Sequence, residues 1–407
     1  MKIIHLSHSD ISGGASRAAY RVHKMLMKYG INSSMWVDIK KSKDDTVFTH
    51  HSFLKSKRQH LRFPINKLLK SSFFGMHSPA LLSSKWLKKI NSSDADIVHL
   101  HWVQGEMLSI KDISRIKKPI VWSFLDMWPF CGCEHYAYND RYSDGYRSDN
   151  RSKNEFKFFD INRWRWNQKV RLFKKPVQII SPSKWMTNCV KKSYLMKNWP
   201  IQTTPLPIDI LKWSPLDKYV VRKKLNLPQK SKLIIFGAIG GTKDPRKGFE
   251  LLRLALKNLS SSHNINLIIF GGGNKNIHSE INFKIHHFDE INNDKDLQEL
   301  YCAADVMVAP SKLETLGQTA IEALACGTPV VAFKGTGLSD IVEHKKTGYL
   351  AEVLNEKDLA KGINWVLEKS SDNTLNIASR KRVENFFSEN EIIKNYKNIY
   401  NNLLKDS

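Results

Sequence analysis

The sequence predicts an α/β fold in two domains, each built on a parallel sheet. Short apolar runs alternate with helical patterns along most of the chain, a pattern typical of parallel sheets covered by helices. The length of 407 residues is sufficient for two cores. A proline-rich stretch near the midpoint, Ile201–Asp209, is the expected linker. We therefore expect a first domain over residues 1–208, a second over 209–386 and a terminal segment over 387–407.

The elements expected in the first domain follow from apolar runs and glycine or proline punctuation. Strands are expected at Lys2–Leu6, Ser34–Val37, Ala95–His101, Pro119–Phe124 and Val177–Ile180. Helices are expected at Ala18–Tyr29, Glu106–Ile116 and Ser183–Lys192. Residues 134–160 are polar and are predicted to form a long loop, and such loops are often functional.

The second domain shows the same alternation. Strands are expected at Leu233–Gly237, Ile265–Phe270, Val306–Ala309 and Val330–Phe333. Helices are expected at Gly248–Leu259, Asp296–Ala304, Gln318–Cys326, Lys357–Lys369 and Leu375–Phe386. The terminal segment predicts an amphipathic helix, Glu391–Leu404, because its large apolar residues fall on one face.

The net charge of +25 is uneven along the chain. Residues 1–200 hold 36 Lys and Arg against 15 Asp and Glu, whereas the remainder holds 28 against 24. This surplus suggests an anionic partner, such as nucleic acid, anionic lipid or a diphosphate-bearing substrate, although a merely soluble basic surface is the alternative. No nucleic-acid-binding module is recognisable, so we do not expect nucleic acid to be the partner.

Composition also bears on the compartment. No run of 18 uncharged apolar residues occurs, and the chain starts with a strand-like run in place of the long apolar region of a signal peptide. Five scattered cysteines do not form a disulfide framework. These features favour the reducing cytoplasm.

The segment Phe53–Lys89 mixes basic and large apolar residues, and Pro64 and Pro79 break it into short pieces. Such a composition suits an element that lies in the interface of a membrane, with its cations on anionic headgroups. The alternative is that its apolar residues pack on the core of the first domain. We expect a peripheral association with an anionic membrane surface.

The stretch from Ala304 to Phe333 predicts strand, loop, helix and strand, and two carboxylates, Glu314 and Glu322, bracket its loop and helix. Both can accept hydrogen bonds from sugar or ribose hydroxyls. The N–H groups of Leu316, Gly317 and Gln318 open the helix and favour an anion such as a nucleotide phosphate. By spacing alone, two such glutamates more often form a solvated face.

The complete string resembles the donor-binding motif of retaining glycosyltransferases of family 4. The matching residues are Glu314, Gly317, Glu322, Ala323, Gly327, Thr328, Pro329, Val330 and Val331. The resemblance continues from Asp340 to Tyr349, and a first-domain string, Asp126–Phe130, is similar to enzymes of colanic-acid, O-antigen and capsule biosynthesis. It implies two Rossmann-like domains facing across a cleft, the GT-B arrangement, with the terminal helix crossing back to the first domain.

The resemblance also assigns a basic pair and a glycine pair to the donor site. Arg246 and Lys247 stand between a strand and a helix, where they could neutralise a diphosphate, although a solvated basic turn is the alternative. Gly13 and Gly14 follow the first strand and match the family's glycine-rich loop; alone they would indicate only a tight turn. No metal is expected, because two cations and a helix N-terminus can stabilise the leaving group.

One position departs from the family. Leu125 stands where related sequences have a histidine that faces the donor sugar. Asp126, next in the chain, and His101, at the end of a strand, are candidates for the missing role, although His101 could be an ordinary buried histidine. The segment Cys131–His135 has two cysteines and a histidine, but no second ligand pair follows, so we do not expect zinc there.

The predicted function is therefore transfer of a sugar, with retention, from a nucleotide-sugar donor to a saccharide acceptor. The acceptor is expected to be a lipid-linked or oligosaccharide precursor of a bacterial surface polysaccharide. The predicted location is the cytoplasm, at the inner face of the membrane. The alternative is a glycosyltransferase-like protein that binds sugars or membranes without turnover, because of Leu125.

Overall fold

The computed structural model describes residues 1–49, 76–153, 159–237, 240–259, 264–272, 281, 283–291 and 293–405. These residues form two compact units. Unit 1 comprises Met1–Thr204 and Ile393–Ser407, and unit 2 comprises Pro205–Ile392. Most of the predicted interfacial segment, from residue 53 to residue 75, lies outside the described residues.

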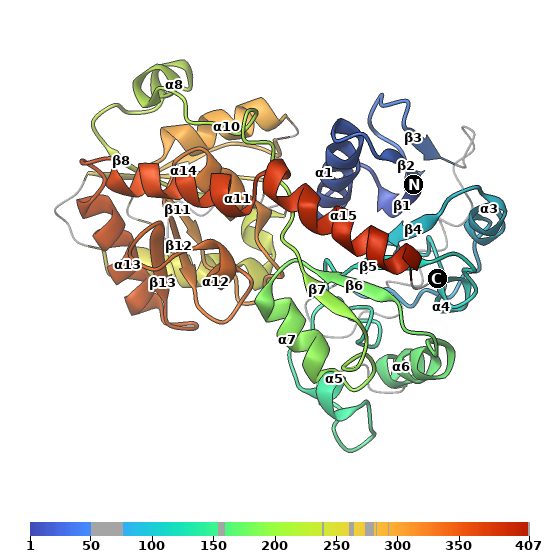
Figure 1. The fold of residues 1–407 in the computed structure, drawn as a ribbon. Coiled ribbons are helices and arrows are strands. Elements are labelled where there is room, and N and C mark those ends of the chain that lie inside the picture. The colour runs from blue at the N-terminus through green and yellow to red at the C-terminus, as the bar shows by residue number, and fades with distance from the viewer. Residues whose placement is uncertain are drawn as a thin grey trace. The chain divides into compact units, whose positions relative to one another are not determined.

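Unit 1 is built on a seven-stranded parallel sheet of order β3-β2-β1-β4-β5-β6-β7 (Figure 1). Its strands are β1 (Lys2–Ser9), β2 (Asn32–Ile39), β3 (Val47–Thr49), β4 (Ile97–Leu100), β5 (Ile120–Ser123), β6 (Gln178–Ser181) and β7 (Ile201–Thr203). Its helices are α1 (Gly14–Lys28), α3 (Trp86–Ser92), α4 (Ile110–Ile113), α5 (Arg141–Asp144), α6 (Ile161–Leu172) and α7 (Lys184–Lys192). Strand order reverses between β1 and β4.

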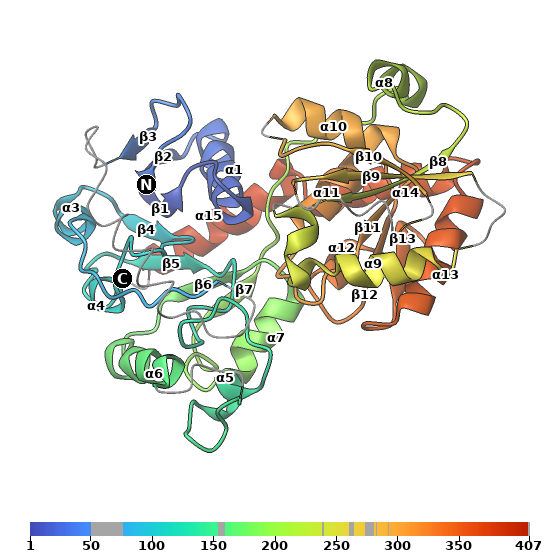
Figure 2. The ribbon, with the colours of Figure 1, turned by 180° about the vertical axis from the view of Figure 1, so that it is seen from behind.

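The two faces of this sheet differ in chemistry. One face carries the apolar side chains of Leu6, Leu100 and Trp122, which belong to a core shared with α3 and α7. The other face carries histidines, and α1 and α15 (Glu389–Lys405) contribute the side chains that meet them. Figures 1 and 2 both show α1 beside the red terminal helix α15.

Unit 2 repeats the design with a six-stranded parallel sheet of order β10-β9-β8-β11-β12-β13. Its strands are β8 (Lys232–Gly237), β9 (Ile265–Phe270), β10 (Lys284–His287), β11 (Val306–Ala309), β12 (Val330–Phe333) and β13 (Gly348–Ala351). Its helices are α8 (Lys218–Lys224), α9 (Phe249–Leu256), α10 (Asp294–Ala303), α11 (Gln318–Ala325), α12 (Leu338–Ile341), α13 (Glu356–Glu368) and α14 (Thr374–Phe386). In Figures 1 and 2, which view opposite sides, α11 and α14 cover one face of the sheet and α9 the other.

The prediction of two parallel α/β domains is confirmed. Each sheet contains the strand order of dinucleotide-binding folds, in which the first strand lies between the second and the fourth. Within the described residues, no helix has both the length and the apolar character needed to cross a bilayer.

Two expectations in the first domain need correction. The helix predicted from Glu106 to Ile116 is reduced to α4, because Glu106 has a φ of 65° and its buried carboxylate accepts hydrogen bonds from the N–H groups of Leu81 and Leu82. Trp86, at the end of the predicted interfacial segment, is buried and its Nε1 donates to Asp38 at 2.7 Å. This end of the segment therefore packs on the core of unit 1, as in the alternative interpretation.

Candidate active site

In unit 2, strand order reverses between β8 and β11, and ligands of open parallel sheets bind beyond the carboxyl ends of the strands at such a point. The segments that follow these two strands hold Arg246, Lys247 and Glu314. Lys247 Nζ lies 2.5 Å from Glu314 Oε2, and Arg246 Nη1 lies 3.8 Å from the same oxygen. The fold thus brings together three predicted site residues from two distant segments of the chain.

The side chain of Glu314 is only 11% exposed. Burial alone would raise its pKa, but the charges of Lys247 and Arg246 outweigh burial and lower the pKa. Glu314 is therefore ionised at neutral pH. Two cations therefore flank this carboxylate, and Arg246 also pairs with Asp244. An anionic ligand would share these cations with the two carboxylates.

Backbone and side-chain contacts hold Arg246 in place. Its Nη2 donates to Asp244 Oδ2 at 3.0 Å, and its Nη1 donates to the carbonyl of Leu313 at 3.1 Å. Its own carbonyl accepts a hydrogen bond of 2.8 Å from the N–H of Lys312. Asp244, which the sequence analysis passed over, thus orients the cation, and the loops after β8 and β11 are fixed to each other.

Close packing of these loops requires a glycine at Gly248. Its φ is 73°, and a Cβ there would lie 1.9 Å from the carbonyl oxygen of Pro310. A side chain would therefore push apart the segments that carry Lys247 and Glu314.

We expect Gly248→Ala to destabilise unit 2 more than Gly272→Ala. Gly272 has a similar φ of 80° but nothing within 4 Å of an added Cβ, so its substitution tests backbone strain alone, about 1–2 kcal/mol. Gly248→Ala adds the clash and should cost roughly twice as much or more. Denaturant unfolding of both variants measures the difference, and equal losses would contradict the close approach.

Helix α11 starts where the sequence predicted, directly after Gly317, whose φ is 104°. Leu316 is buried, and Gln318 is partly exposed at the first turn of the helix. Glu322 is buried on the same helix, and its Oε2 accepts a hydrogen bond of 3.1 Å from the hydroxyl of Tyr301 in α10. Glu314 therefore contacts the basic pair, whereas Glu322 contacts α10.

The glycine loop of unit 1 opens α1, with a φ of 89° at Gly13 and with Gly14 as the first helical residue. A Cβ at Gly13 would meet nothing within 4 Å. The loop is held by Asp10, whose buried carboxylate accepts hydrogen bonds of 2.8–3.0 Å from the N–H groups of Ile11, Lys41 and Ser42. Burial alone would raise the pKa of Asp10, but these hydrogen bonds lower it.

Asp126 follows β5, and its hydrogen-bond partners among the described residues lie within unit 1. Its Oδ2 lies 2.5 Å from Nδ1 of His135 and accepts a hydrogen bond of 2.8 Å from Nε1 of Trp102. Its Oδ1 accepts from the N–H of Trp128. The carboxylate is buried, so Asp126 acts foremost as the centre of a hydrogen-bond network, and its catalytic role stays a prediction. Leu125, the position at which the resemblance implies a histidine, is partly exposed.

His101 lies inside unit 1, in a layer with two other buried histidines, His5 and His99. Nε2 of His101 lies 2.8 Å from Nδ1 of His5, while His99 contacts the hydroxyls of Tyr400 and Ser123, each at 2.8 Å. Burial lowers the pKa of His101 to about 3. This environment favours the alternative of an ordinary buried histidine over a catalytic one.

Among the described residues, the same three histidines form the one group whose ligand atoms lie close enough for a metal, within 4.8 Å of one another. The rings of His99 and His101 stack at 4.1 Å, however, and stacked rings do not direct their lone pairs to one point. The geometry therefore favours a hydrogen-bonded layer. The prediction of a metal-independent reaction remains a prediction.

The segment Cys131–His135 serves the structure of unit 1. Cys131 and Cys133 are buried, and His135 is bound to Asp126 and to the hydroxyl of Ser78 at 2.8 Å. The buried ammonium of Lys169 donates to the carbonyls of Trp128, Cys131 and Gly132. Burial lowers the pKa of Lys169 to about 7. These contacts give the aromatic-rich turn a structural role in unit 1.

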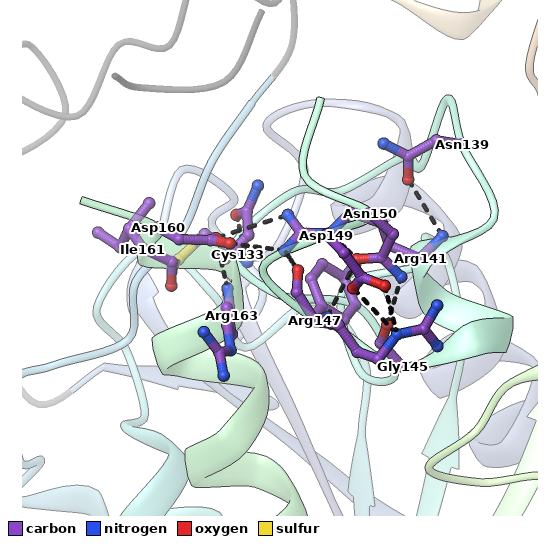
Figure 3. Close-up of polar contacts among 12 residues, drawn as sticks. Cys133, Asn139, Arg141, Gly145, Arg147, Asp149, Asn150, Asp160, Ile161 and Arg163 are labelled. Atoms are coloured by element: carbon purple, nitrogen blue, oxygen red, sulfur yellow. Dashed lines mark hydrogen bonds and ion pairs between the residues drawn. The ribbon is translucent and has the colours of Figure 1, made fainter. Parts of the chain in front are cut away.

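The loop over residues 134–160 is organised by Arg141 (Figure 3). This buried guanidinium donates to Asp160 at 2.6 Å, to Asn150 at 3.1 Å and to the carbonyl of Arg147 at 3.1 Å. Its charge also lies 4.5 Å from the centre of the ring of Tyr146. The predicted long loop therefore has a defined core of its own over its described residues.

Comparison with known proteins bears on both the site and the fold. Residues 217–384 match the model of the family described as glycosyl transferases group 1. Unit 2 carries a glycosyl transferases group 1 region. This region includes four of the predicted site residues, Arg246, Lys247, Glu314 and Glu322.

A curated relative and two solved structures are also similar to this chain. An uncharacterized glycosyltransferase of Methanocaldococcus jannaschii is 31% identical over 205 residues, which cover 48% of this chain and 51% of that protein. The chain spans about half the length of this curated relative. A sucrose-phosphate synthase from Thermosynechococcus elongatus has a TM-score of 0.71 over 100% of both chains at 18% identity. Anabaena HepE in complex with UDP and glucose has a TM-score of 0.65 over 98% of both chains at 16% identity. The fold is therefore that of these two solved structures.

Proposed function

We propose that the protein is a retaining glycosyltransferase that moves a sugar from a nucleotide-sugar to a saccharide acceptor. The observation that carries this proposal is the contact of Glu314 with Lys247 and Arg246 at the switch point of unit 2. A carboxylate suits the hydroxyl groups of a sugar, and a pair of cations suits a diphosphate. One site thus offers partners for both halves of a nucleotide-sugar.

In the proposed reaction, the bond from the anomeric carbon to the diphosphate oxygen breaks, and an acceptor hydroxyl oxygen forms the new bond on the same face. The proton of that hydroxyl passes to the leaving diphosphate. The transition state has oxocarbenium character, and negative charge grows on the leaving diphosphate. Lys247, Arg246 and the helix N-terminus at Gly317 would stabilise that charge. Arg246 is already oriented by Asp244, so little reorganisation is needed.

Unit 1 would bind the acceptor. The segment at Leu125 and Asp126 follows the carboxyl end of β5, where open sheets bind ligands. The basic surplus of the first 200 residues supports a lipid-linked acceptor met at an anionic membrane, on the cytoplasmic face. A precursor of a bacterial surface polysaccharide is the acceptor class we infer.

We expect Lys247→Ala to weaken the binding of nucleoside diphosphate by about tenfold or more, because a charge-assisted contact to phosphate is lost. Isothermal titration calorimetry with UDP, GDP and ADP measures this loss for whichever nucleotide binds. Lys257→Ala, at an exposed position after α9, is the matched control and should bind normally. Equal affinities for the two variants would remove Lys247 from the donor site.

The proposal as a whole is tested by a screen of nucleotide-sugar donors. The protein is incubated with each donor and with lipid-linked saccharide acceptors, and mass spectrometry detects an acceptor heavier by one sugar residue. NMR gives the anomeric configuration of the product, and the same configuration as in the donor would show retention. Nucleoside-diphosphate binding without turnover for any donor would favour a binding protein with a glycosyltransferase fold.

A further inference from the structure

We infer that one face of α6 is a docking surface for an anionic bilayer. The α6 face consists of Arg163, Trp164 and Arg171 on the helix, of Phe159 just before it, and of Lys174 and Lys175 just beyond it. All six side chains are exposed. The inference rests on the proposed function in one respect, since a lipid-linked acceptor would be met at a membrane.

The aromatic part of the α6 face is unusually open to solvent. Phe159 is 51% exposed and Trp164 is 43% exposed, and their ring centroids lie 5.9 Å apart. Two large neighbouring rings in water lose much of the stabilisation that burial would give them. At the interface of a bilayer, by contrast, Trp and Phe side chains are favoured.

The Trp164 ring is held in place from the protein side. The guanidinium of Arg165 lies 4.9 Å from the centre of this ring. Arg165 is itself buried, and its Nη2 donates to the carbonyl of Ala80 at 2.7 Å. Because a fixed group supports the ring, its exposure does not require the helix to move.

The charge of the α6 face is positive throughout. Asp160, at the start of the helix, caps the N–H of Arg163 at 2.8 Å and pairs with the buried Arg141 at 2.6 Å (Figure 3). The buried Arg141 therefore neutralises the charge of the Asp160 carboxylate. None of Arg163, Arg171, Lys174 and Lys175 has an acidic partner within the part of the chain that the structure describes.

Cations beside exposed aromatic rings match the chemistry of a bilayer that contains anionic lipid. The cations would contact the headgroups, and the two rings would enter the region between headgroups and acyl chains. A soluble polyanion would use the cations but would leave the Phe159–Trp164 pair in water, unless its bases stacked on the rings. The experiment below separates these partners.

Vesicle flotation measures binding to two kinds of vesicle, one of phosphatidylcholine alone and one of phosphatidylcholine with roughly 30% phosphatidylglycerol. We expect binding only to the anionic vesicles. The variant Arg163→Glu/Arg171→Glu should weaken it by roughly 25-fold or more, and Phe159→Ser/Trp164→Ser by about tenfold. Arg163→Lys/Arg171→Lys should bind as the original protein does, because the charge is kept.

Matched controls lie on α8 and near it in unit 2. Tyr219, which is 63% exposed, and Val220 are replaced by serine, and Lys223 and Lys230 are replaced by glutamate in a second variant. Both control variants should bind anionic vesicles normally. Nucleoside-diphosphate binding should be unchanged in the α6 variants, and transfer to a detergent-solubilised acceptor tests the proposed function separately from membrane binding.

Several outcomes would overturn the inference. Equal binding to neutral vesicles, or equal losses in the α6 and α8 variants, would do so. The inference would also be overturned if both α6 variants bound anionic vesicles fully while neutralising the cations of Lys55–Lys70 abolished that binding. Binding of single-stranded RNA that depends on the α6 face, with no binding to vesicles, would assign the surface to nucleic acid.

Discussion

Replacing Glu314 with glutamine will reduce sugar transfer by roughly a hundredfold while the protein stays folded. The carboxylate is ionised between Lys247 and Arg246, and in the proposed reaction it binds the donor sugar in the transition state. Glutamine keeps the size of the side chain and an acceptor oxygen for Lys247, but it removes the charge. The measurement is kcat for transfer with the donor found in the screen.

The same substitution should not weaken nucleoside-diphosphate binding, since it frees Lys247 from a competing charge. Glu352→Gln is the control, because Glu352 is an exposed glutamate that also pairs with a lysine, Lys334. Its activity should be that of the original protein. Full activity of Glu314→Gln would exclude this carboxylate from the mechanism.

Stability will fall steeply as the pH decreases from about 6.5 to 4, because unit 1 buries several neutral histidines. Burial lowers the pKa of His5, His99 and His101, and it lowers the pKa of His23 to about 4. The unfolded chain takes up protons below a pKa of about 6.5, whereas the folded chain does not. Each such histidine therefore removes about 1.4 kcal/mol of stability per pH unit in this range.

Urea unfolding at pH 7.5, 6.5 and 5.5 measures this loss. Carboxyl groups whose pKa is lowered contribute mainly below pH 4, so the upper part of the range reports on histidines. His99→Gln can keep hydrogen bonds to Tyr400 and Ser123 without a titrating group, and its stability should depend less steeply on pH. The same slope in both proteins would contradict a neutral histidine layer.

The fold was predictable wherever one strand or helix carries its own pattern. The strands Val306–Ala309 and Val330–Phe333 and the helix between them are continuous apolar or periodic runs, and the structure has them at those positions. Helix α6 was missed, because its sequence has no apolar period. The helix is instead stabilised by the cap at Asp160 and by buried Arg165 and Lys169. Such tertiary contacts leave no local pattern in a sequence.

Most residues of the candidate site could be named from the sequence, but the contacts between them could not. Arg246, Lys247 and Glu314 were each identified, but their ion pairs depend on two loops meeting beside the switch point. Asp10 and Asp244 were not identified, because their function is to accept hydrogen bonds that only the folded loops provide. A carboxylate that orients a loop looks, in a sequence, like any exposed aspartate.

The ion pair of Lys247 with Glu314 has a consequence for turnover in the proposed reaction. A bound diphosphate must share Lys247 with Glu314, so the empty site competes with its own nucleotide ligands. When a donor is bound, hydroxyl groups of its sugar would donate hydrogen bonds to Glu314, and these would replace the ion pair with Lys247. After transfer the sugar leaves, and Glu314 would pair with Lys247 again. The nucleoside diphosphate would then bind less tightly. In the proposed reaction, this competition would limit inhibition by the nucleotide product.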